Sequence, residues 1–74
     1  MTKIARHARI ETIAARRLKD QDFPLDVRFS GGWRQVYYVS TDGLRDEEIV
    51  ILWDRDGKEI AKVYPYTELR WRQY

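Results

Sequence analysis

Apolar residues in the first twenty positions of the chain recur with the spacing of an α-helix. They fall at i, i+3, i+4 and i+8, which places their side chains on one face of a helix. The segment contains no proline or glycine and is rich in alanine and arginine, which favour helices. The sequence therefore predicts an amphipathic helix over about residues 2–20. Its core-facing residues are Ile10, Ile13, Ala14 and Leu18.

From residue 25 onward apolar and polar residues alternate, which is the period of a half-buried β-strand. Leu25–Phe29 and Trp33–Ser40 flank the pair Gly31-Gly32, and paired glycines favour a two-residue hairpin turn. With that turn, the predicted core face consists of Leu25, Val27, Phe29, Val36 and Tyr38. The opposite face carries Arg28, Trp33, Gln35, Tyr37 and Val39.

The second half of the chain predicts three more strands. Ile49–Trp53 is almost continuously apolar, and Glu59–Tyr64 follows it after a turn that contains Asp56-Gly57. That turn allows two registers, with Trp53 opposite either Ile60 or Glu59. Residues 69–74 fit either a last strand or a last helical turn, and the alternation of Arg70 and Arg72 with Trp71 favours the strand. The predicted fold is one α+β domain over residues 1–74, with the N-terminal helix packed on a twisted antiparallel sheet of four to five strands (about 25–74), leaning toward a small barrel.

Positive charge is concentrated near the N-terminus. The first nineteen residues hold six basic groups and one acid, for a net charge of +5, whereas the rest holds eight basic and eleven acidic groups. In a helix, Arg9, Arg16 and Lys19 would form one outward ridge. Such a ridge suits a phosphate backbone or an acidic protein surface, and a solvated helix face is the plain alternative.

Composition removes several classes of function. The chain has 74 residues, no cysteine and a single histidine, His7, so thiolate and multi-histidine metal sites are excluded. No apolar run approaches the roughly 18 residues that cross a bilayer. No set of residues combines a nucleophile, a base and an oxyanion donor. We therefore expect a cytoplasmic protein without enzymatic activity, cofactor or membrane association, for which homo-oligomerisation would add stability.

The predicted order of elements resembles the Sm-like barrels, and within them the bacterial Hfq type. The resemblance covers about residues 10–72. It is carried by the helix that leads into Phe23-Pro24-Leu25, the glycine turn after Phe29, the long strand from Trp33 to Thr41, the strand Ile49-Val50-Ile51-Leu52 and a tight turn near 65–68. The resemblance implies an RNA-binding protein that assembles into a ring.

Two features depart from that family. The Tyr-Lys-His signature of the Hfq type, which helps to form its site for uridine-rich RNA, corresponds here to Tyr64-Pro65-Tyr66. Only Tyr64 remains as a stacking residue, because the lysine and histidine are absent. The long second strand also lacks the glycine that lets an Sm-type strand bend. The resemblance therefore implies the barrel more than it implies the ring and its RNA site.

Two functions of different classes fit these patterns. In the first, a non-catalytic module binds nucleic acid, with RNA favoured, through phosphate contacts and stacked bases. In the second, the chain is a protein-binding inhibitor or adaptor, of phage or mobile-element type, that acts on a host nucleic-acid machine. The hairpin face with Arg28, Trp33 and Tyr37 could stack bases, form a protein interface or be buried within the domain. The candidate binding residues are Arg9, Arg16, Arg17, Lys19, Arg28, Trp33, Tyr37 and Tyr64.

Overall fold

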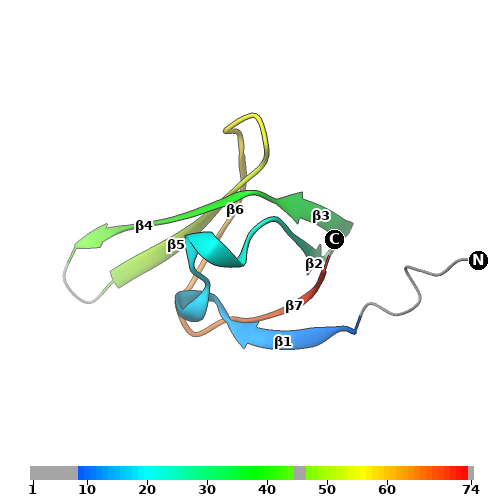
Figure 1. Cartoon of the computed structure of the whole chain (residues 1–74). Helices are drawn as coiled ribbons and strands as arrows, with labels where there is room; N and C mark the ends of the chain where they lie inside the picture. The colour runs from blue at the N-terminus through cyan, green and yellow to red at the C-terminus, as the bar shows by residue number, and fades with distance from the viewer. Residues whose placement is uncertain (1–8, 45–46, 74) are drawn as a thin grey trace, which may run out of the picture.

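The computed structural model describes residues 9–44 and 47–73, and these residues form mostly β-structure (Figure 1). Within these ranges no helix is long and apolar enough to cross a membrane. Two short 3-10 turns follow the first strand, η2 (Ala15–Arg17) and η3 (Asp20–Asp22). The strands are β1 (Glu11–Ala14), β2 (Leu25–Phe29), β3 (Gly32–Val36), β4 (Tyr38–Leu44), β5 (Glu47–Trp53), β6 (Glu59–Val63) and β7 (Glu68–Gln73).

The predicted N-terminal helix is wrong, and with it the α+β fold class. Residues 11–14 form β1, which pairs with β7 so that Ile13 lies opposite Leu69. Helical spacing is a weak local preference, and a long-range strand pair overrides it because the pair satisfies the backbone while burying Ala15 and Leu18. Ile10, predicted to face the core, is 57% exposed. Residues 2–8 of the predicted helix lie outside the described residues.

Within the described residues, seven antiparallel strands form two sheets with the orders β1-β7-β2-β3 and β4-β5-β6. A single residue, Tyr37, separates β3 from β4, so that one long chain segment passes from the first sheet into the second (Figure 1). This change of sheet occurs without a glycine, since the segment 33–42 contains none. The Tyr37 N–H donates to the Trp53 carbonyl oxygen at 2.9 Å, which continues the pairing with β5 across the break.

The core lies between the two sheets. β2 and β3 contribute Leu25, Val27 and Val36, and β5 contributes Val50 and Leu52. Within the described residues the buried core holds no polar or charged side chain. Alternation along β2 and β5 therefore leaves the intervening side chains on the outer faces of the two sheets.

The first hairpin differs in register from the prediction by two residues. Its turn consists of Ser30 and Gly31, while Gly32, with a φ of 128°, already pairs with Phe29. A shift of two positions keeps every side chain on its face, so Leu25, Val27 and Val36 remain in the core as predicted. Tyr38, predicted to be in the core, is 51% exposed because it opens β4 beyond the break. Val39, predicted to face outward, packs against the core instead.

The C-terminal strands follow the predicted pattern. The second hairpin takes the register with Trp53 opposite Glu59, and a bulge lies between Leu52 and Trp53. The last strand is confirmed as β7, which pairs with β1 on one side and with β2 on the other and so joins them in the four-stranded sheet. Arg70 and Arg72 therefore share the outer face of that sheet with Asp26 and Arg28 of β2.

Candidate functional site

The basic residues near the N-terminus are exposed but do not share a helical ridge. Arg9 precedes β1, Arg16 and Arg17 belong to η2, and Lys19 precedes η3. Leu18 between the two turns is extended, with φ −71° and ψ 137°. The predicted ridge of Arg9, Arg16 and Lys19 is therefore wrong, because it depended on helical phasing through residues that adopt three different conformations.

Instead, backbone hydrogen bonds dock η2 onto the turn before β7. The Ala15 N–H donates to the Thr67 carbonyl oxygen, and the Arg16 N–H donates to the Pro65 carbonyl oxygen, both at 2.8 Å. The turn itself is closed by the Thr67 N–H, which donates to the carbonyl oxygen of Tyr64 at 3.1 Å. Residues 15–16 and 64–67, distant in the sequence, are thus fixed against each other.

This docking brings the Arg16 side chain against the turn before β7, and we call Arg16, Tyr64 and Tyr66 the Arg16 corner. The Arg16 guanidinium carbon lies 5.2 Å from the Tyr66 ring centroid, within cation–π range. Tyr64, which begins the turn, and Tyr66 are 74% and 76% exposed. The predicted binding residue Arg16 thus contacts the turn that the predicted residue Tyr64 begins. Tyr66 was missed, although the stretch Tyr64-Pro65-Tyr66 carries its signal.

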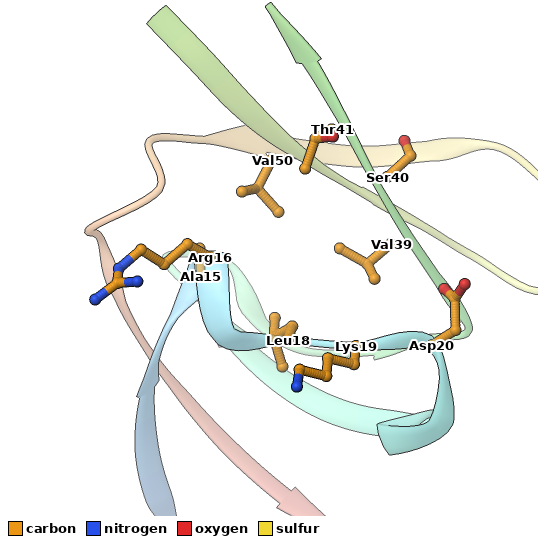
Figure 2. Close-up of a pocket in the computed structure, with 9 residues that line it drawn as sticks. All are labelled: Ala15, Arg16, Leu18, Lys19, Asp20, Val39, Ser40, Thr41 and Val50. Carbon is orange, nitrogen blue, oxygen red and sulfur yellow. The ribbon is translucent and has the colours of Figure 1, made fainter. Parts of the chain in front are cut away.

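A groove of about 230 Å³ lies next to the Arg16 corner, between η2 and the edge strand β4 (Figure 2). Its walls combine apolar core side chains with the polar residues Ser40 and Thr41, and the Ser40 hydroxyl accepts a hydrogen bond from Trp53 Nε1 at 2.8 Å. In Figure 2 the Arg16 side chain points away from the groove, so its guanidinium stays available on the outer surface. The groove residues are Ala15, Arg16, Leu18, Lys19, Asp20, Val39, Ser40, Thr41 and Val50.

Trp33 and Arg28 lie on the outer face of the four-stranded sheet, as predicted, directly opposite each other on β2 and β3. The Arg72 guanidinium carbon lies 4.0 Å from the Trp33 ring centroid, and the Arg28 guanidinium carbon lies 6.0 Å from it. Arg72 Nε also donates to Asp26 Oδ2 at 3.1 Å. Trp33 is half-buried, and its contact with Arg72 makes it part of an intramolecular stack rather than a free platform for a base. Arg72 was not predicted as a binding residue, although its alternation with Trp71 along the strand is visible in the sequence.

Tyr37 and Trp33 line the same shallow depression, which has a volume of about 240 Å³. Tyr37 is half-buried between β3 and β4, with its ring centroid 6.4 Å from that of Tyr38. The wall of the depression also holds two acids, Asp54 and Asp56, and two arginines, Arg34 and Arg55. Its formal charges therefore balance, in contrast to the cationic surroundings of Tyr66.

Asp54 organises the turn between β5 and β6. Its Oδ1 atom accepts hydrogen bonds from the Asp56 and Lys58 N–H groups at 2.9 and 2.8 Å. The hairpin interpretation of this acidic stretch is thereby confirmed. Within the part of the chain that the structure describes, no group of three or more histidine, cysteine or acidic side chains could hold a metal ion.

Comparison with known proteins yields no relative. No family model matches the chain, and neither the curated proteins nor the solved structures contain a significant match. The functional argument therefore depends on the residues that the fold brings together.

Proposed function

We propose that this chain is a small, non-catalytic cytoplasmic module that binds single-stranded nucleic acid, with RNA favoured, at the Arg16 corner. The observation that carries the proposal is the contact of Arg16 with the exposed ring of Tyr66, in a turn that two backbone hydrogen bonds fix against η2 and that also holds the exposed Tyr64. Exposed aromatic rings next to cations are typical of surfaces that bind unpaired bases and their phosphates.

Each part of the Arg16 corner has a distinct role in this proposal. Tyr64 and Tyr66 stack on bases, which is worth about 1–3 kcal/mol per base. Arg16, with the exposed Arg17 and Lys19 that follow it, contacts the phosphates. Arg9, exposed ahead of β1, adds a further positive charge at the same end of the chain. The cation–π contact holds the Tyr66 ring in place before RNA arrives, so less conformational freedom is lost on binding.

The resemblance to Sm-like barrels is part of the proposal. It is supported by the long segment that passes from β3 into β4 at Tyr37, whereas the helix leading into Phe23-Pro24-Leu25, which also carried the resemblance, is absent from residues 9–20. The stretch that corresponds to the family's Tyr-Lys-His signature holds two tyrosines here, Tyr64 and Tyr66. We therefore expect base stacking to contribute without the family's lysine and histidine.

The test is fluorescence anisotropy with a labelled twelve-nucleotide oligouridylate at several salt concentrations. The variant Tyr66→Ala should weaken binding by roughly 5- to 150-fold, which corresponds to about 1–3 kcal/mol. The variant Arg16→Gln should lower the magnitude of the salt slope by about 0.7, because one phosphate contact is lost. Tyr38→Ala and Lys62→Gln are matched controls, since both residues are exposed on the other sheet. No binding by the unmodified chain, or equal losses in the controls, would refute the proposal.

Protein binding is the second candidate, and one observation favours it. β4 is an edge strand of the three-stranded sheet, and the groove lies beside it. An extended segment of a partner can add to such an edge through main-chain hydrogen bonds. Affinity purification from a lysate split into nuclease-treated and untreated halves separates the two functions. A stoichiometric protein that survives nuclease treatment supports the second, and loss of all bound material supports the first.

A further inference from the structure

Strand register places two arginines opposite each other on the outer face of the four-stranded sheet. Arg28 of β2 pairs with Arg70 of β7, and both side chains are exposed. The same row continues to Thr12 of β1 on one side and to Trp33 of β3 on the other. A single row across four strands therefore holds a hydroxyl group, two guanidinium groups and an indole ring.

The positive charge of this pair is not neutralised by the carboxylates nearby. Asp26, the acid on the neighbouring row, is paired with Arg72 at 3.1 Å. Glu68 lies on the same face but opposite Ala14, one row beyond Arg70. Among the described residues, neither Arg28 nor Arg70 forms an ion pair. Like charges directly opposite on adjacent strands are unfavourable, so an anion that lies between them relieves a repulsion already present in the fold.

The chemistry of the two side chains matches a phosphate group. Directly opposite residues on paired strands have Cβ atoms about 5 Å apart, so two guanidinium groups can converge on one anion. Each guanidinium presents several N–H donors in a planar fork that suits phosphate oxygens. The Thr12 hydroxyl next to Arg70 is a further donor. In the structure Arg28 lies toward β3, with its guanidinium carbon 6.0 Å from the Trp33 ring centroid and its Nε donating to the Phe29 carbonyl oxygen at 3.3 Å, so its side chain turns toward β7 when it shares an anion with Arg70.

We infer that Arg28 and Arg70 together bind one phosphate of a nucleic-acid backbone, as a second contact separate from the Arg16 corner. This inference rests on the proposed function for the source of the phosphate. It assigns a binding role to Arg70 and gives Arg28 the partner with which it acts. Trp33 and Arg72 then serve as a fixed wall beside the phosphate, because their stack and the ion pair with Asp26 hold them in place.

The phosphate site can be tested without RNA. Side-chain Nε–Hε signals of the arginines are followed by NMR during titration with inorganic phosphate, with sodium chloride at matched ionic strength as the control. Arg28 and Arg70 should shift together and saturate, whereas Arg55, exposed in the turn before β6, should not. Shifts that follow chloride equally, or that are the same for Arg55, would refute the site.

The role in RNA binding is tested with the double variant Arg28→Gln/Arg70→Gln and the labelled oligouridylate. Loss of one phosphate contact by this pair should lower the magnitude of the salt slope by about 0.7. The matched control Lys58→Gln/Lys62→Gln removes the same charge from the other sheet and should leave the slope unchanged. Arg28→Lys/Arg70→Lys, which keeps the charge, should restore it. Circular dichroism and the melting temperature confirm that each variant is folded.

The outcomes separate this inference from the proposed function. If the unmodified chain binds RNA and the glutamine variant retains its slope, the inference fails and the proposed function stands. If the chain does not bind RNA, the backbone as the source of the phosphate is refuted with the proposed function. The NMR titration with inorganic phosphate then decides by itself whether Arg28 and Arg70 form a phosphate site.

Discussion

Leu52 is the residue whose replacement tests the arrangement of the two sheets most directly. Its side chain is 0% exposed, near the C-terminal end of β5, and its strand partners are Val39 on β4 and Ala61 on β6. Leu52→Ala removes three buried carbon groups at about 0.8 kcal/mol each and leaves a cavity. The expected loss of unfolding free energy is about 2–5 kcal/mol. For a chain of this length the whole stability is roughly 4–11 kcal/mol.

Urea denaturation followed by circular dichroism measures this loss. With a slope near 1 kcal/mol per M for a domain of this size, the midpoint should fall by about 2 M or more. Ile10→Ala is the control, because Ile10 is 57% exposed and should change stability by less than about 0.5 kcal/mol. A midpoint for Leu52→Ala that matches the control would mean that Leu52 is not between the sheets. A changed slope would instead indicate an altered unfolded state or an intermediate.

Three further predictions follow from local contacts. Asp54→Ala removes the acceptor for two backbone N–H groups and should lower the free energy of unfolding, measured by urea denaturation, by about 1–3 kcal/mol. Asp54→Asn keeps an oxygen acceptor and should lower it clearly less. Gly57→Ala should cost about 1 kcal/mol through backbone strain alone, since φ is +81° and no atom lies within 4 Å of the added Cβ; an unchanged melting temperature would contradict that backbone conformation. Arg72→Gln should lower the free energy of unfolding by about 1 kcal/mol. A double-mutant cycle with Trp33→Leu should show coupling between the two residues, and additive losses of unfolding free energy would mean that their stack contributes nothing.

Strand patterns could be predicted from the sequence because alternation survives errors in register. The inward positions of Leu25, Val27 and Val36 are confirmed although the hairpin pairs two residues away from the predicted register. A shift of two keeps the period of side-chain direction, so the face was predictable even where the partner was not. Partner identity depended on whether Gly32 belongs to the turn or to the returning strand. Its φ of 128° is a conformation that glycine adopts readily, so Gly32 can begin the returning strand.

The N-terminal segment could not be predicted because its structure is set by residues more than fifty positions away. The set Ile10, Ile13, Ala14 and Leu18 satisfies a helical spacing, yet Ile13 pairs with Leu69 and the Ala15 N–H donates to the Thr67 carbonyl oxygen. Local spacing contains no information about a free edge of β7 elsewhere in the fold. The Arg16 corner was hidden for the same reason, since Tyr66 reaches Arg16 only through that docking. Arg70 opposite Arg28 likewise follows from the β2–β7 pair and from no local pattern.

The positive charge is therefore distributed differently in the fold than along the sequence. In the sequence it forms one N-terminal segment with a net charge of +5, which suggests a single basic arm. In the fold, Arg16 is anchored against the turn before β7, and Arg28 faces Arg70 on β7 itself. Both cationic clusters thus depend on where β7 lies, one at its start and one along its length. The Arg16 corner requires β1 beside β7, because η2 follows β1 directly, whereas the Arg28–Arg70 pair requires only the pairing of β7 with β2. Detachment of β1 should therefore weaken the Arg16 corner while leaving the Arg28–Arg70 pair on β2 and β7 intact.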